Sequence, residues 1–179
     1  MSNARNISAL STVEVGATAD QTKSDIEGLA IDVASAQLPA GSVLQVVQAT
    51  SNSTTEPNTS WTVISGSSIS ITPSSTSSKV LINFSAGGMT NGVPDNISLR
   101  LKRGSTVVRA MSRYGYQSIS GWVPIPMSLS YLDSPATSSS VTYTIETKTD
   151  TDNDYRINND QSSNGGVNGL VMIAMEIGG

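Results

Sequence analysis

The sequence predicts an all-β protein: an antiparallel β-sandwich of the jelly-roll-like kind, preceded by a short N-terminal arm with one possible helix. Three observations support this fold class. Apolar and polar residues alternate in short runs, turn-forming residues separate these runs at near-regular spacing, and no second helical pattern follows residue 40. Between eight and nine short strands are expected, which is enough for two packed sheets.

The clearest strand pattern lies in residues 78–110. Apolar residues occupy every second position over 80–84 and again over 97–101, with a turn-rich break between the two runs. The second run reaches Arg103-Gly104 and resumes at residues 106–108. A glycine-containing reversal between two alternating runs predicts a β-hairpin.

The same alternation of apolar and polar residues, bounded by turn-forming residues, predicts the remaining strands. They are expected at residues 43–47, 61–71, 125–131 and 141–148, with loops at 51–60 and 74–78. Pro124 and Pro126 remove backbone donors, so the strand at 125–131 is expected to lie at an edge or to begin with a bulge.

The last strand, residues 170–177, is apolar on both faces. The pattern assigns Leu170, Ile173, Met175 and Ile177 to one side, but Val171, Met172 and Ala174 are apolar too. One face can enter the core, and the other then needs a second layer of its own chain or another subunit. We expect a symmetric oligomer, with Val171, Met172 and Ala174 in its seam.

Residues 1–40 form the predicted arm, and residues 41–179 the predicted sandwich domain. Within the arm, residues 24–27 fit a helix capping box, and Ile26, Leu29 and Val33 follow at helical spacing. Three copies could form a short coiled-coil seam through these side chains, so a trimer is the favoured oligomer. A lone helix lying on its own domain explains the spacing equally well. Leu38-Pro39 ends the pattern.

Composition excludes several function classes. The net charge is -4 with ten Lys and Arg residues, so binding to nucleic acid or to an anionic membrane is not expected. The chain has no His and no Cys, which removes the commonest catalytic base, thiol nucleophiles and thiolate metal ligands. No run of apolar residues is long enough to span a bilayer or resembles an export leader. The chain is expected to be neither an enzyme nor a cofactor-binding protein.

Two segments are candidate ligand sites. Asp150, Asp152 and Asp154 begin like a calcium loop, but Tyr155 stands where the loop needs glycine and Gln161 where it needs glutamate. A solvated loop between strands explains these aspartates without a metal.

The second segment interleaves arginines with aromatic residues. Such residues can stack on sugars and bond their hydroxyls, or form a protein contact. Strand core plus a subunit seam is the alternative interpretation. The candidate receptor or inter-subunit residues are Arg109, Arg113, Tyr114, Tyr116 and Trp122.

Five stretches, in order, resemble the C-terminal domains of bacteriophage tail-fibre and related virion appendage proteins. They lie at residues 37–48, 78–83, 99–106, 130–136 leading into 141–144, and 172–177. The resemblance implies a trimeric jelly-roll-like domain on a virion appendage, assembled in the host cytoplasm, at a fibre tip or in a linking module. It carries over no catalytic motif and no receptor site. An arm of 40 residues is short for a full fibre, so a collar or baseplate component or a capsid-decorating head fibre fits as well. The alternative from another class is a free carbohydrate-binding module or adhesin.

Overall fold

Nine strands and no helix make up the part of the chain that the computed structural model describes, residues 38–91, 95–117, 122–151, 155–158 and 169–179. The strands are β1 (Val43–Ser51), β2 (Thr62–Ile71), β3 (Lys79–Asn91), β4 (Asp95–Arg103), β5 (Thr106–Gln117), β6 (Trp122–Asp133), β7 (Val141–Thr149), β8 (Tyr155–Ile157) and β9 (Leu170–Ile177). No helix in these ranges is long and apolar enough to cross a membrane.

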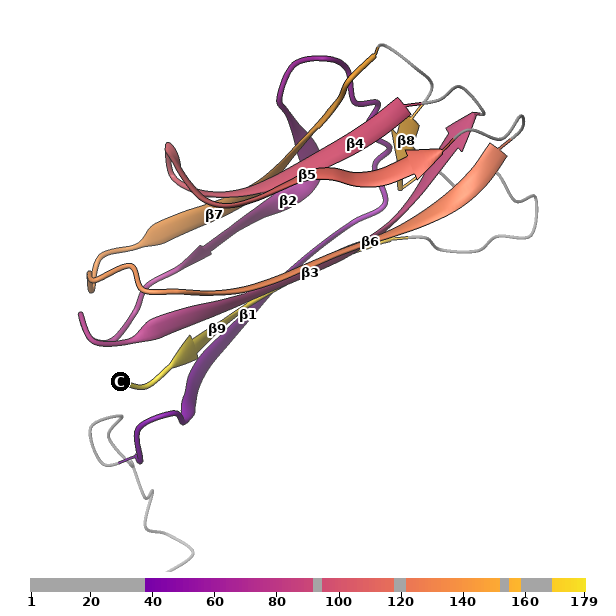
Figure 1. Cartoon of the computed structure of the whole chain (residues 1–179). Helices are drawn as coiled ribbons and strands as arrows, with labels where there is room; N and C mark the ends of the chain where they lie inside the picture. Colours follow the sequence, from indigo (N-terminus) through magenta and orange to yellow (C-terminus); the bar gives the residue numbers. More distant parts are fainter. Residues whose placement is uncertain (1–37, 92–94, 118–121, 152–154, 159–168) are drawn as a thin grey trace, which may run out of the picture. The chain divides into compact units, whose positions relative to one another are not determined.

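The strands form two antiparallel sheets that pack as a sandwich. Sheet A has the order β1-β9-β3-β6, with β8 also pairing with β3, and sheet B has the order β2-β7-β4-β5. Figure 1 shows the two layers, with β2, β4, β5 and β7 in one and β1, β3, β6 and β9 in the other. The predicted fold class is confirmed, and so is the hairpin, in which β4 pairs with β5.

The core forms where the inner faces of the two sheets meet. Successive side chains of a strand point to opposite faces, so every second residue enters this layer. Each fully buried aliphatic side chain contributes about 1.5–3 kcal/mol. The most deeply buried apolar residues come from both sheets: Val80, Ile82, Met172 and Ala174 from sheet A, and Ile64, Ile97, Leu99, Leu101 and Ile145 from sheet B.

The structure corrects two details of the sequence prediction. The break expected after Phe84 is wrong, because β3 continues to Asn91 and pairs with β6 from Val80 to Asn91. The assignment of faces in the last strand is also wrong. Leu170 lies on the inner face with Met172 and Ala174, and Val171 and Ile173 lie on the other face.

Two further predictions lie beyond what the structure describes. The possible helix at residues 24–33 is outside the described residues. The boundary between arm and domain at residue 40 stays a prediction, and β1 begins shortly after it.

A bulge interrupts β2 where it passes β7. Val63 pairs with Glu146 and Ser68 with Thr144, so residues 64–67 lie opposite a single residue, Ile145. Gly66 adopts a φ of +80°, and a side chain there would collide with Ser51.

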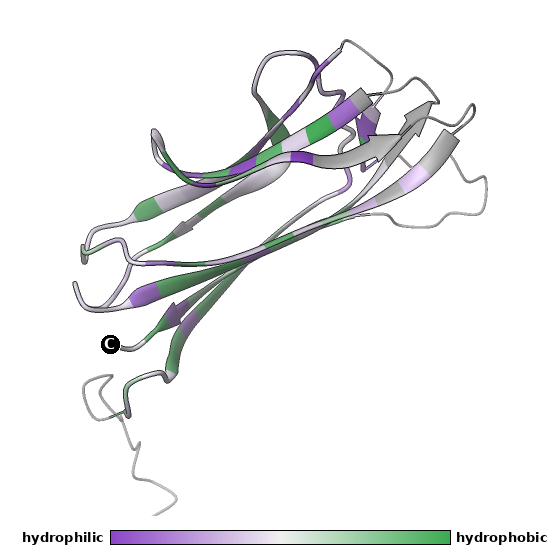
Figure 2. Cartoon of the chain, viewed as in Figure 1, coloured by the Kyte–Doolittle hydropathy of each residue, from purple (hydrophilic) through white to green (hydrophobic). Residues whose placement is uncertain are grey.

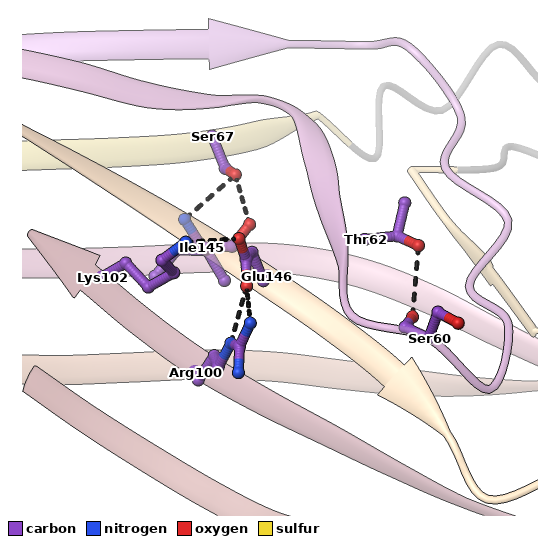
Figure 3. Close-up of polar contacts among 7 residues, drawn as sticks. All are labelled: Ser60, Thr62, Ser67, Arg100, Lys102, Ile145 and Glu146. Carbon is purple, nitrogen blue, oxygen red and sulfur yellow. Dashed lines mark hydrogen bonds and ion pairs between the residues drawn. The ribbon is translucent and has the colours of Figure 1, made fainter. Parts of the chain in front are cut away.

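The hydroxyl of Ser67 replaces the ladder bonds that the bulge removes. It lies 3.3 Å from the backbone nitrogen of Ile145, whose N–H it accepts, and 2.9 Å from the carbonyl oxygen of the same residue. It also lies 2.7 Å from the carbonyl oxygen of Ile64. Figure 3 shows Ser67 beside Ile145. Because Ser67 is fully buried, no water can take over this role.

Replacing Ser67 with alanine should lower the free energy of unfolding by about 1–3 kcal/mol, because the Ile145 N–H loses its buried acceptor. Urea denaturation measures this change. Ser68→Ala, at the exposed neighbouring position, is the matched control and should change the unfolding free energy by less than about 0.5 kcal/mol. Equal losses in the two variants would contradict the role given to the Ser67 hydroxyl.

A buried carboxylate ties the two sheets together at one end of the sandwich. Asp133, at the end of β6 in sheet A, accepts hydrogen bonds of 2.7 Å from Arg103 on β4 and from the hydroxyl of Tyr143 on β7. Burial, and then the hydrogen bond and charge of Asp133, raise the pKa of Tyr143 above its ordinary value. The tyrosine therefore stays protonated and remains a donor to this carboxylate.

A second buried carboxylate, Glu176 on β9, fixes the turn between β2 and β3. Its Oε1 accepts the backbone N–H of Ser74 at 2.7 Å and the Ser74 hydroxyl at 2.6 Å. Burial alone would raise the pKa of Glu176, but these hydrogen bonds outweigh it and lower the pKa.

Candidate functional site

The outer face of sheet A, which points away from the core, is the most distinctive surface in the described part of the chain. Its residues alternate with the buried ones along β1, β9, β3 and β6. From the strand registers, three rows cross all four strands: Val46, Met175, Leu81 and Leu132; Gln48, Ile173, Asn83 and Ser130; Thr50, Val171, Ser85 and Ser128. A shorter row next to the first one, Val43, Ile177 and Lys79, carries one exposed cation, Lys79.

The first of these rows, which we call the apolar row, is hydrophobic on all four strands. Val46 is 59% exposed and Leu132 is 47% exposed, at the two edges of the sheet, and Met175 and Leu81 are partly exposed between them. Ile173 and Val171 extend the apolar surface along β9, and Val43, also exposed, extends it on β1. Figure 2 shows hydrophobic residues on β1 and β3 where these strands run side by side with β9.

The three rows contain no charged residue. Cross-strand neighbours of this kind make a continuous neutral surface, and exposed apolar surface that extends over several strands marks a contact site. The arrangement suits a protein partner and offers no group for acid, base or metal chemistry.

The outer face of sheet B has the opposite character. Glu146 on β7 accepts hydrogen bonds from Arg100 at 2.6 Å and from Lys102 at 3.1 Å, both from β4 (Figure 3). The Arg100 guanidinium also lies 4.2 Å from the centre of the Trp61 ring, and the Lys148 ammonium lies 5.5 Å from it. The charges of this face are therefore paired with one another or stacked on Trp61, as is usual on a sheet face that points to solvent.

The pKa of Glu146 reflects this network. Burial would raise the pKa, but the hydrogen bonds and charges of Arg100 and Lys102 outweigh burial and hold the pKa below its ordinary value of 4.5. The ionised carboxylate is therefore the form that stabilises the fold.

Stability should fall in acid because the pKa values of Glu146 and Glu176 are both lowered by folding. A lowered folded-state pKa contributes stability that is fully present above the ordinary value of 4.5 and is lost as the pH falls through the folded-state pKa. Urea denaturation between pH 7 and pH 2.5 should therefore show a decline that begins below about pH 4.5.

Glu146→Gln should flatten part of this acid decline and lower the stability at pH 7, because the amide keeps the shape but not the charge. A decline of unchanged size in Glu146→Gln would show that this carboxylate does not contribute to it.

The structure places two of the five candidate contact residues. Arg109 and Arg113 lie on β5 with exposed side chains. Arg113 has a φ of +54°, its N–H donates to the Ser98 hydroxyl at 3.1 Å, and its Nε lies 3.4 Å from Asp150. The backbones of Tyr114 and Tyr116 belong to β5 and that of Trp122 begins β6, but their side chains are outside the described part.

The candidate metal cluster meets this segment at Asp150. Its carboxylate accepts a hydrogen bond from the Asn96 side chain at 2.9 Å and also faces Arg113. Asp152 and Asp154 lie outside the described residues. Within the described ranges, no three carboxylates gather as metal ligands would. Asp150, directly after the last residue of β7, therefore connects this end of β7 to Asn96 on β4 and Arg113 on β5.

Only some of the residues predicted to form the oligomer seam lie where another subunit could reach them. Met172 and Ala174 are fully buried in the core of their own chain, so neither can reach another subunit, which corrects that part of the prediction. Val171 lies on the outer face of sheet A, whereas Ile26, Leu29 and Val33 are outside the described residues. Val46, Leu81 and Leu132 were missed. Each is an apolar residue directly beside an apolar residue of the opposite face, which could have marked it singly, but the sequence does not show that the three share a row.

Comparison with known proteins gives little. No family model matches the chain, and no curated protein does. Among solved structures, a structure of infectious bursal disease virus, Gx strain, aligns over 75% of this chain with 10% identity and a TM-score of 0.40. The chain spans 37% of the length of that protein chain. A similarity this weak says nothing about function.

Proposed function

We propose that this chain is a structural subunit of a bacteriophage virion that assembles as a homo-oligomer through the outer face of sheet A. The observation that carries the proposal is the apolar row, which crosses all four strands of a sheet whose other face is already buried in the core. Covering this row with a partner removes exposed apolar surface from water, which favours association.

A second copy of the chain is the partner that this face fits best. The chain has a net charge of -4, so two copies repel one another in most orientations. The three rows that cross all four strands carry no charge, so the outer faces of neighbouring copies can pack around a shared axis without like-charge repulsion between these rows. A trimer, which the arm pattern and the resemblance favour, is the oligomer we propose.

The virion role rests on the ordered resemblance of residues 37–179 to phage tail-fibre domains, together with a surface that offers binding and no catalytic centre. A short tail fibre or a related tail, collar or baseplate appendage is the first choice, and a capsid-decorating head fibre the second. We assign host-surface attachment, where it occurs, to the exposed arginines of β5, Arg109 and Arg113.

The alternative function is a free carbohydrate-binding module, which would bind its glycan without being part of a virion. A glycan array with the chain lacking residues 1–36 distinguishes a virion subunit from a free carbohydrate-binding module. Binding of a glycan by this truncated chain favours the free module.

A charge placed in the apolar row should break the oligomer. Leu132→Glu puts a carboxylate at an exposed position of β6 and should weaken association at least about 100-fold, because an unpaired buried charge costs several kcal/mol. Sedimentation at micromolar concentration measures the mass. Ala110→Glu, exposed on sheet B, is the control and should keep the oligomer. A monomeric wild-type protein, or an unchanged mass for Leu132→Glu, would contradict the proposal.

Deleting residues 1–36 should abolish incorporation into particles, because in our proposal this arm attaches the chain to other virion proteins. The β-sandwich should remain folded and oligomeric, since its core and the outer face of sheet A lie entirely beyond residue 42. Immunoblotting of purified particles measures incorporation, and circular dichroism checks the fold. Normal incorporation of the truncated chain would refute the role of the arm.

A further inference from the structure

The edges of the two sheets are protected unequally. The main path of sheet A ends in β1 and β6, with the three-residue strand β8 pairing β3 off this path, and sheet B ends in β2 and β5. An edge strand presents unpaired backbone N–H and C=O groups that can pair with another chain, and folded proteins block this pairing with bulges, prolines and charged residues.

Three of the four edges carry such protection. The bulge at residues 64–67 breaks the line of β2, and Gly66 brings the strand against Ser51. Arg109 and Arg113 place charges along β5, whose register with β4 shifts twice. Pro124 and Pro126 interrupt the donors of β6.

The fourth edge, β1, has only one of these features, a register shift near its start. Its sequence, VLQVVQATS, contains no charged residue and no proline. After one shift between Val43 and Gln45, its register with β9 runs without a break to Ser51. Among the described strands β1 pairs only with β9, so no described strand pairs with its other edge. Valine-rich, neutral and regular strands are the ones most prone to pair.

We propose that β1 pairs antiparallel with β1 of a second copy about a twofold axis, so that two copies of sheet A become one continuous sheet. A strand without charges is compatible with itself, because no like charges come opposite each other. Antiparallel pairing also keeps outer-face residues on the same side. With the axis at Val47, for example, Val46 of one copy lies opposite Gln48 of the other, and the neutral outer face continues across the junction.

This contact is distinct from the one proposed for the outer face. Edge pairing lies in the plane of the sheet, whereas the face contact is perpendicular to it, so one can exist without the other. The inference does not depend on a virion role.

Distances between spin labels test the pairing. The chain has no cysteine, so a single introduced cysteine is its only labelling site. Gln48→Cys and Ser130→Cys place nitroxides at exposed positions of the same row, on β1 and on β6. The full-length chain carrying Leu132→Glu is used as the background, so that the face contact is removed, and its mass is measured separately.

Edge pairing predicts very different distances at the two positions. The paired β1 backbones lie one strand spacing apart, about 5 Å, whereas the two β6 strands lie seven spacings apart, about 34 Å. Dipolar spectroscopy should therefore give a short distance for labels at position 48 and a long one at position 130. Short distances at both positions, or no coupling at either, would overturn the proposal.

A pair of lysine substitutions provides a second test that needs no label. Gln48→Lys brings two like charges together across the proposed junction and should weaken pairing at least about tenfold in sedimentation. Ser130→Lys adds the same charge to the same row at the opposite edge and should leave pairing unchanged. Equal effects from the two substitutions would overturn edge pairing, and so would no effect from Gln48→Lys.

Discussion

The packing of one apolar sheet face against another is the constraint from which the rest of this structure follows. Ile82 in sheet A and Leu99 and Ile145 in sheet B are fully buried in the shared layer. Because side chains alternate along a strand, filling this layer determines which residues must point outward. The two outer faces then differ in chemistry: sheet B carries an ion-pair network around Glu146, and sheet A carries the apolar row.

Apolar packing alone does not fix how the two sheets are oriented, because it is not directional. Hydrogen bonds of buried polar groups are directional, so they fix the orientation of the sheets at particular residues. Asp133 requires donors from both β4 and β7, and Glu176 requires the turn at Ser74. A buried carboxylate without its donors is strongly destabilising, so alternative alignments of the sheets that separate these groups are disfavoured.

The sequence predicted the class of fold because alternation is a local property, visible in residues 80–84 and 97–101. It failed where the answer depends on a distant partner. The glycines of β3 look like a break, yet β6 supplies hydrogen bonds that keep Gly87 and Gly88 in the strand. In β9 both faces are apolar, so no local signal decides that Met172 is inside. The apolar row joins residues far apart in sequence and becomes visible only through the registers.

Unequal protection of the edges limits how far edge pairing could extend. A twofold contact through β1 occupies that edge in both copies, and the opposite edge, β6, is interrupted by Pro124 and Pro126. Pairing in the plane of sheet A therefore stops at two copies and cannot continue into a fibril. A larger assembly built on this pairing would then need another contact, and the outer face of sheet A, with its apolar row, offers one perpendicular to the sheet. The edge pairing and the face contact proposed above would together give assemblies that close at a defined size rather than fibrils.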